Sequence, residues 1–384
     1  MVLKLLKGSR LLNKVLVRNF SAEVIPKSNE RQVFARRAAT NDPLTHTVQD
    51  ISKFYTVPKE EQVKLFGLYE FPAQFQLNHK TFNETAFMIR QPALEIINSL
   101  KTLDPTKPVH KHLLYGRWGD GKSMSMNHVV HFAYKSDFLL VHIPSPAIWL
   151  KWSREVCTSE TKPGQINIPV QSAQFLKNFR NQNDALLQKL DLRITDEIVW
   201  SPREKTEKDS TFLELIDLGI NRLKYAADVV DILLDEIKKK STEQKCKTLV
   251  AIDGFNCFFN EKTHLRAEDR SRVVPQQITL VQSLLKLTKC DWTNGVVVVS
   301  VDVSAAFQHQ RESFMPLYLL TKEGFEHLDP FNPILVPALS EKECNSLLDF
   351  YEEKKWLLKP EGRHEIEFLS TRNAFSVTEL CGPY

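Results

Sequence analysis

Residues 111–124 read KHLLYGRWGDGKSM, and they constrain the architecture more tightly than any other stretch of the chain. Within them, residues 116–123 match the phosphate-binding pattern G-x-x-x-x-G-K-[ST] at every fixed position. Gly119 and Gly121 permit backbone conformations that are closed to residues with a β-carbon, so consecutive N–H groups can point at phosphate oxygens. Residues 111–115 predict a strand before the loop and residues 123–134 a helix after it. Together they predict a nucleotide-binding site.

The individual residues of the loop have separate predicted roles. Lys122 supplies a mobile cation for the outer phosphates, and the Ser123 hydroxyl is a magnesium ligand. The N-terminal end of the following helix adds partial positive charge. The predicted nucleotide contacts are Gly116, Arg117, Trp118, Gly119, Asp120, Gly121, Lys122, Ser123 and Met124.

Asp253 follows the apolar strand residues 249–252, which is the Walker-B arrangement of a carboxylate that holds magnesium through water. The alternative is an ordinary aspartate that ends a strand. Many hydrolytic relatives of this architecture place a glutamate directly afterwards as the base that activates water, but this chain has Gly254. General-base assistance is worth roughly 10²–10⁴ in rate. The sequence therefore assigns no catalytic residue and predicts at most slow hydrolysis.

Further candidate contacts come from three other places in the chain. Ser300 and Asp302 end a predicted strand where a residue that senses the γ-phosphate usually lies, although either could equally cap a loop. Met88 and Arg90 precede a predicted helix, where related ATPases hold the base and ribose. Arg372 lies near the C-terminus and could reach a phosphate.

Two other patterns are interpreted as structural. Residues 288–291 fit the guanine-reading motif [NT]-K-x-D, but they end a predicted helix instead of following a strand, so they give no argument for GTP. His128 and His131 are spaced i, i+3 on the helix after the loop. No third ligand accompanies them, and packing is the better interpretation.

The composition is that of an ordinary soluble globular protein. The chain has 384 residues, of which 42 % are hydrophobic and 26 % charged. No stretch approaches the roughly 20 uninterrupted apolar residues of a membrane span. The six cysteines form no C-x-x-C pair, which argues against a zinc site and favours free thiols in a reducing compartment.

Residues 1–20 differ from the rest because they carry five basic residues, no acidic residue and many interleaved leucines and valines. This is typical of a mitochondrial presequence, and the alternative is a frayed surface helix. Without those five basic residues, the net charge of +4 becomes −1. Bulk charge therefore gives no support for a large nucleic-acid footprint.

The chain is predicted to have an α/β fold with a parallel sheet covered by helices on both faces. The predicted strands are continuous apolar runs at residues 111–115, 138–143, 248–252, 295–301 and 333–336. The long gap between the second and third strands predicts a helical insertion. Ser340 and Glu343 form a predicted capping box at the start of a C-terminal helix. The predicted parts are a presequence at 1–20, an extended N-terminal arm with short helices at 21–80, a P-loop nucleotide-binding domain at 81–337 with its insertion at about 146–245, and a helical lid at 338–384.

The strand series, Asp253 and the helical lid resemble the AAA+/STAND branch of P-loop NTPases. Two segments narrow the match: TFNETAFMIRQPALE at residues 81–95 and GFEHLDPFNPILV at residues 324–336. With HVVHF at 128–132 and HIP at 142–144, they resemble the death-associated protein 3 family. The similarity extends from about residue 55 to the C-terminus.

The resemblance implies a structural constituent of the head of the mitochondrial small ribosomal subunit, near the bridges to the large subunit. The implied partners are small-subunit proteins, ribosomal RNA and large-subunit bridge contacts, and the implied location is the mitochondrial matrix. The implied cofactors are GTP or GDP with Mg, and ATP is not excluded. Asp120 departs from the small or hydroxyl residue expected there, and its carboxylate would oppose phosphate binding.

Two alternatives from other classes stay open. One is a nucleotide-operated, STAND-type switch in mitochondrial signalling or apoptosis, whose lid moves on slow hydrolysis. The other is a metabolic P-loop kinase. The missing glutamate after Asp253 favours the structural role, and the sequence contains no evident acidic or aromatic cleft for a phosphate acceptor.

Overall fold

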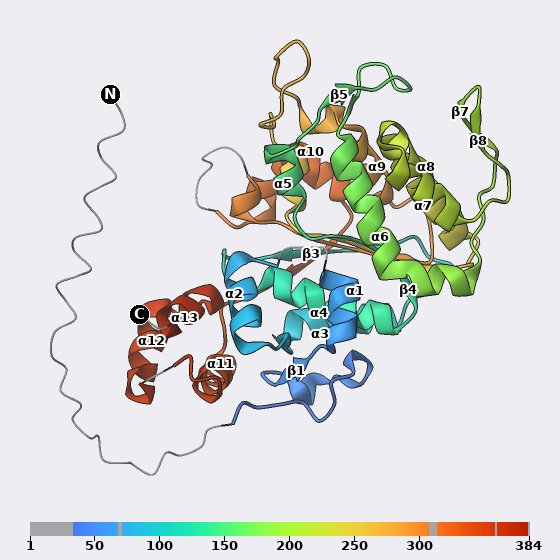
Figure 1. The fold of residues 1–384 in the computed structure, drawn as a ribbon. Helices are drawn as coiled ribbons and strands as arrows, with labels where there is room; N and C mark the ends of the chain where they lie inside the picture. Colours follow the sequence, from blue (N-terminus) through green and yellow to red (C-terminus); the bar gives the residue numbers. More distant parts are fainter. Residues whose placement is uncertain (1–33, 68–70, 307–312, 358, 383–384) are drawn as a thin grey trace, which may run out of the picture. The chain divides into compact units, whose positions relative to one another are not determined.

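Five strands form a parallel sheet at the centre of the fold (Figure 1). A computed structural model describes residues 34–67, 71–306, 313–357 and 359–382. The predicted presequence and residues 21–33 of the predicted arm lie outside the described residues. The strand order is β11-β3-β10-β9-β4, and every neighbouring pair is parallel. The strands are β3 (His110–Tyr115), β4 (Phe138–Ile143), β9 (Lys247–Ile252), β10 (Gly295–Ser300) and β11 (Asn332–Leu335).

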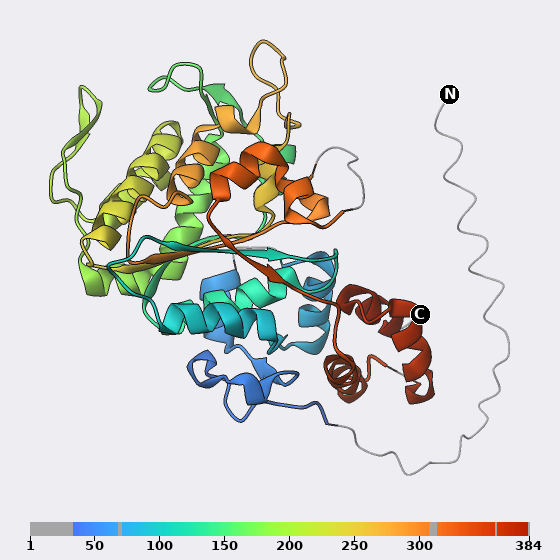
Figure 2. The same ribbon diagram turned by 180° about the vertical axis from the view of Figure 1, so that it is seen from behind.

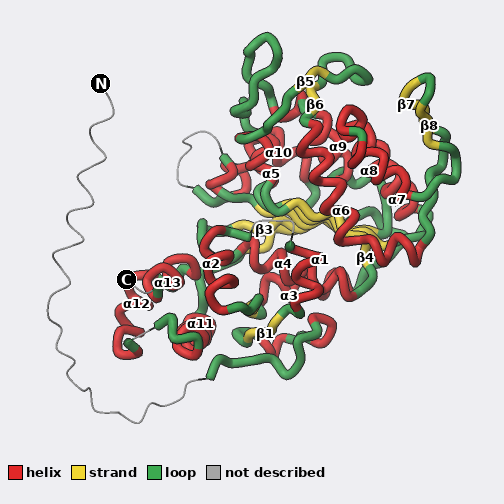
Figure 3. The backbone as a smooth tube through the Cα atoms, in the orientation of Figure 1, coloured by secondary structure: helices red, strands yellow, loops and turns green. Residues whose placement is uncertain are grey.

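The structure confirms the α/β class and places the bounds of all five predicted strands within one residue of the prediction. The strands could be recognised because a parallel sheet covered on both faces demands continuous apolar runs. All six residues of β10, for example, are buried. Helices cover both faces of the sheet, as Figures 2 and 3 show.

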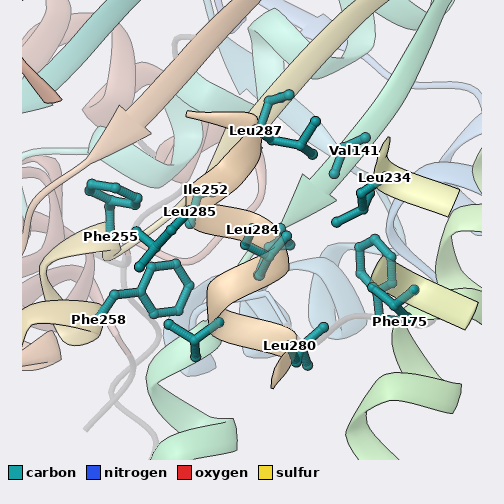
Figure 4. Close-up of a cluster of buried hydrophobic side chains, with 14 of the residues drawn as sticks. Val141, Phe175, Leu234, Ile252, Phe255, Phe258, Leu280, Leu284, Leu285 and Leu287 are labelled. Carbon is teal, nitrogen blue, oxygen red and sulfur yellow. The ribbon is translucent and has the colours of Figure 1, made fainter. Parts of the chain in front are cut away.

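Alternate strand residues point to two separate cores. Val141 and Ile252 face α6 (Pro169–Leu190), α8 (Ala226–Thr242) and α9 (Thr279–Leu287), where leucines and phenylalanines fill the space (Figure 4). Leu114 and Val298 face α3 (Gln91–Lys101) and α4 (Lys122–Lys135) on the other side. The remaining helices near the sheet are α5 (Pro146–Lys151), α7 (Phe212–Asn221) and α10 (Pro316–Leu328).

The region of the predicted insertion contains α5 to α8 and two hairpins that the sequence did not predict. The hairpins pair β5 (Cys157–Thr158) with β6 (Ile166–Asn167) and β7 (Ile198–Ser201) with β8 (Glu204–Thr206). Helix α6 also protects the outer edge of the sheet. The Asn183 amide accepts a hydrogen bond from the Leu140 N–H at 2.7 Å and donates to the Leu140 carbonyl at 2.9 Å. The backbone N–H and carbonyl of Leu140 in the edge strand β4 are thereby satisfied.

The described part of the predicted N-terminal arm has the expected short helices, but it is folded against the core and not extended. It contains β1 (Phe54–Thr56), α1 (Lys59–Phe66) and α2 (Ala73–Phe82). Strand β1 pairs antiparallel with β2 (Ala86–Met88). Tyr55 and Leu65 are fully buried. Burial of such large apolar side chains outweighs the polar composition that suggested an exposed arm.

The C-terminal helices are α11 (Glu341–Glu353), α12 (Arg363–Ser370) and α13 (Ala374–Cys381). The predicted capping box is confirmed, because Glu343 N–H donates to Ser340 Oγ at 3.2 Å and Ser340 N–H donates to Glu343 Oε2 at 2.8 Å. The part of the predicted lid that follows α11 forms two separate helices, α12 and α13. Thr371 and Arg372 both adopt left-handed conformations, with φ of 50° and 59°, and these end α12. No helix among the described residues is long and apolar enough to cross a bilayer.

Candidate functional site

A cavity of about 790 Å³ lies at the carboxyl ends of the strands, where open α/β sheets bind their ligands. One end of the cavity is polar and contains residues of the loop between β3 and α4, together with Asp253 and Asp302. The other end is aromatic, and its walls come from α2 and α11 as well as α1. The aromatic residues there are Phe54, Phe66, Phe71, Phe75, Phe82, Phe350 and Tyr351.

The glycine loop, residues 116–123, has the backbone that its sequence predicts. Gly116, Gly119 and Gly121 have φ of 153°, 87° and 95°, which other residues rarely adopt. Gly121 is the N-cap of α4, so the free N–H groups of the first helical turn lie beside the loop. Gly116 has a different reason to be glycine, because a β-carbon there would lie 2.3 Å from the Val336 carbonyl oxygen. These features suit a loop that surrounds an anion.

Lys122 is buried at the base of the loop, with 4 % of the residue exposed. Its ammonium donates to the carbonyls of Gly116 at 3.0 Å and Arg117 at 2.9 Å. It also forms an ion pair with Asp302 Oδ2 at 2.8 Å. The predicted phosphate-binding cation is therefore held next to a carboxylate.

Asp253 and Ser123 come together as predicted for a magnesium site. The Asp253 carboxylate accepts hydrogen bonds from the hydroxyls of Ser123 and Ser300. Strand β10 lies between β3 and β9, so Ser300 fills the space between Asp253 and the loop strand. Burial raises the pKa of Asp253, although the two hydroxyls act in the opposite direction. A carboxylate beside a hydroxyl is the hard oxygen donor set that Mg²⁺ prefers, so these residues fit the ion.

The Asp120 carboxylate contacts the C-terminal helices, which the sequence did not predict. The carboxylate is buried and accepts a hydrogen bond from the Asn373 amide at 2.8 Å. Burial raises the pKa of Asp120, which disfavours the charged form. The unusual residue of the loop therefore serves as a contact with the C-terminal helices.

The start of α13 lies directly on the glycine loop. The Asn373 amide also donates to the Trp118 carbonyl at 2.9 Å, and Phe375 N–H donates to the Gly119 carbonyl at 3.1 Å. The rings of Trp118 and Phe375 have their centroids 4.3 Å apart. Sequence reasoning missed these contacts, because 255 positions separate Asn373 from Trp118. The one local signal, the N-cap position of Asn373, says nothing about a distant partner.

Arg90 lines the cavity, but its guanidinium is already engaged with protein groups. Nε pairs with Glu343 Oε1 at 3.1 Å, Nη1 donates to the Asp120 carbonyl at 2.5 Å, and Nη2 donates to the Pro337 carbonyl at 2.9 Å. Arg90 and Glu343 are both buried. The side chain therefore joins the end of β2, the glycine loop and the C-terminal helices, and its predicted contact with a nucleotide stays a prediction.

The three other candidate contacts lie in different surroundings. Met88 lines the cavity beside Arg90. Ser300 is fully buried beneath Asp253, and its hydroxyl accepts a hydrogen bond from Gly254 N–H at 2.9 Å. Arg372 is exposed in the turn between α12 and α13, and the described cavity lining does not include it. The structure thus brings Met88 to the site, gives Ser300 a supporting position and leaves Arg372 at the surface.

The two patterns interpreted as structural have packing roles. Thr288 directly follows α9, and its hydroxyl donates to the Leu285 carbonyl at 2.9 Å. His128 lies 3.0 Å from a ring nitrogen of His46, and His131 lies 2.7 Å from Glu61. Among the described residues, no group of three or more metal-binding side chains is present.

Glu84 is the glutamate in the described lining of the cavity, and it is not placed as a base. Burial raises its pKa, but Arg37, Lys354 and Thr56 outweigh burial and lower the pKa to about 2. Its carboxylate is therefore charged and already neutralised by two cations. Gly254 adopts a left-handed conformation after Asp253, with φ of 79°, and supplies no side chain. The site is better equipped to bind an anion than to activate water.

Comparison with known proteins gives consistent results. Residues 87–379 match the family model described as "Mitochondrial ribosomal death-associated protein 3". The chain is 36 % identical over 357 residues to "Small ribosomal subunit protein mS29" of Bos taurus, covering 92 % of this chain and 89 % of that protein. It is 35 % identical over 357 residues to the Mus musculus protein of the same name, covering 92 % and 90 %.

Proposed function

The chain belongs to the mitochondrial ribosomal death-associated protein 3 family, and from this premise we propose that it is a structural constituent of the small subunit of the mitochondrial ribosome. The names and near full-length coverage of its bovine and mouse relatives support this proposal. The predicted presequence supports a location in the mitochondrial matrix. Its partners would be small-subunit proteins and ribosomal RNA, with contacts to the large subunit across the bridges.

The proposed molecular role is to hold a purine nucleotide with Mg²⁺, with GTP or GDP favoured by the resemblance and ATP left open. The observation that carries this role is the glycine loop at the end of the cavity, with Lys122 and the N-terminus of α4 beside it. The loop N–H groups and Lys122 would bind the phosphates, and Ser123 and Asp253 would hold the metal. The fold would then be that of the AAA+/STAND branch of P-loop NTPases.

A bound nucleotide would stabilise the fold because loop and lid residues line one cavity. The lid is the set of helices α11 to α13, which supplies Phe350 and Phe375 to the lining. A ligand that binds only the folded state stabilises it by RT ln(1 + [L]/Kd), or about 4 kcal/mol at 1,000 Kd. Gly254 after Asp253 favours a long-lived nucleotide over rapid turnover.

Sedimentation of the endogenous protein from gently lysed mitochondria tests the ribosomal role. The proposal predicts co-migration with the small ribosomal subunit on a density gradient, and that this co-migration survives moderate salt. Migration as a free protein near its own mass would contradict it. The switch would then become the leading candidate, because the contacts of Asn373 and Phe375 with the loop could transmit the state of a nucleotide to the lid.

A further inference from the structure

The ammonium of Lys122 has three N–H donors, and three protein oxygens lie within hydrogen-bonding distance of it. Two are the carbonyls of Gly116 and Arg117, at 3.0 and 2.9 Å. The third is Asp302 Oδ2 at 2.8 Å, which also brings a negative charge. A phosphate oxygen that approaches this ammonium must displace or share one of the three.

Hydrogen bonds to both the side chain and the backbone of Asp302 hold it in place. Its Oδ1 accepts hydrogen bonds from Ser304 N–H at 2.8 Å and from the Ser304 hydroxyl at 2.6 Å. Its backbone N–H donates to Asn256 Oδ1 at 2.9 Å, and its carbonyl accepts from Asn256 Nδ2 at 3.0 Å. Asn256 is itself buried. The carboxylate therefore cannot move away from Lys122 without breaking the Ser304 bonds.

The negative charge around Lys122 is already high. The Asp253 carboxylate lies close enough to Asp302 for the two charges to interact. In a phosphate loop the lysine reaches the β- and γ-phosphates, whereas the backbone N–H groups hold the inner phosphates. A γ-phosphate would therefore bring further negative charge to Lys122, whose positive charge Asp302 already neutralises.

We propose that Asp302 is a specificity-determining residue that makes the site favour a nucleoside diphosphate over the corresponding triphosphate. The carboxylate takes the place of a third phosphate as the anionic partner of Lys122. This inference rests on the proposed nucleotide binding and identifies the phosphate state that the site selects. A constituent that retains diphosphate needs no base after Asp253, in agreement with Gly254 at that position.

The test is the ratio of two dissociation constants, measured for GDP and for GTP with excess Mg²⁺ at low temperature, with the nucleotide checked for hydrolysis afterwards. The wild-type protein is expected to bind GDP more tightly. Asp302→Asn keeps an oxygen acceptor for the Ser304 groups but removes the charge. It is expected to shift the ratio toward GTP by at least about tenfold, because like charges a few ångströms apart repel strongly in a partly buried site.

Two further variants sharpen the result. Asp291→Asn makes the same chemical change at an exposed residue that pairs with Lys238 at 2.8 Å, and it should leave the ratio unchanged. Ser304→Ala keeps the charge of Asp302 but frees its carboxylate, so it should shift the ratio in the same direction by a smaller factor. Repeating the series with ADP and ATP tests the same preference independently of the base.

The outcomes separate this inference from the proposed function. If the wild-type protein binds both nucleotides but Asp302→Asn leaves their ratio unchanged, or shifts it toward GDP, then Asp302 does not oppose the γ-phosphate and the inference is wrong. If the wild-type protein binds none of the four nucleotides GDP, GTP, ADP and ATP, the proposed nucleotide binding is wrong, and the inference is wrong with it.

Discussion

Lys122 is the residue on which the proposed site depends most. Lys122→Ala is expected to abolish nucleotide retention and to lower the melting temperature. It also leaves the partly buried Asp302 carboxylate without its cation, which is expected to lower the free energy of unfolding by about 3 kcal/mol even without nucleotide. Nucleotide affinity and thermal melting check the prediction. Lys189→Ala, which breaks an exposed pair with Asp137, is the control and should cost less than about 1 kcal/mol. Unchanged affinity and melting temperature in Lys122→Ala would contradict the account.

Two buried histidines with lowered pKa values should make the free energy of unfolding depend on pH. Burial, with a smaller contribution from His110, lowers the pKa of His112 to about 4, and burial lowers that of His142 to about 3. Their unfolded pKa is about 6.5, so below that pH the unfolded chain binds protons that the folded protein does not. The contribution of these two histidines to the free energy of unfolding is therefore fully present above pH 6.5. It falls as the pH drops toward 4, by up to about 1.4 kcal/mol per pH unit for each histidine.

Urea denaturation at pH 7.5, 5.5 and 4.5 measures this dependence. The free energy of unfolding should decrease at each step, and His112→Asn should show a shallower decrease than the wild-type protein. A free energy of unfolding that is constant or rises as the pH falls from 7.5 to 4.5 would show that these histidines are not held neutral by the fold.

At the scale of elements, the buried pair between Arg90 and Glu343 joins β2 and the lid to the glycine loop. Glu343→Gln removes the charge but keeps a residue suited to the capping box of α11. It is expected to cost about 3–5 kcal/mol, because it leaves Arg90 buried and uncompensated. Denaturant unfolding measures this cost. Glu341→Gln changes an exposed glutamate in the same helical turn and should cost less than about 0.5 kcal/mol. Equal costs for the two variants would mean that the pair does not anchor the lid.

The sequence predicted best those strands in which nearly every residue is buried. Strands such as β9 and β10 consist mostly of buried apolar residues because helices cover both faces of the sheet. Local sequence was not sufficient where one tertiary contact decided the structure. The fully buried Tyr55, for example, packs the predicted arm into the core. The loop contacts of Asn373 are of the same kind, since they depend on a partner 255 positions away.

At the scale of the whole molecule, the cavity is lined by residues that lie far apart in the sequence, from β1 to the C-terminal helices. Phe54 near the N-terminal side stacks on Phe350 of the lid with ring centroids 4.6 Å apart, and both line the cavity that the glycine loop enters. A nucleotide in this cavity would contact loop and lid residues together, and so make the fold more rigid as a component of a large assembly.

The most direct test of this account is the nucleotide content of the full-length protein purified under native conditions. Denaturing the protein and separating the released small molecules by chromatography identifies and counts them. The account predicts about one purine nucleoside diphosphate per chain, and a melting temperature that rises when the same nucleotide is added in excess. Release of no nucleotide, together with a melting temperature that no added purine nucleotide changes, would contradict it.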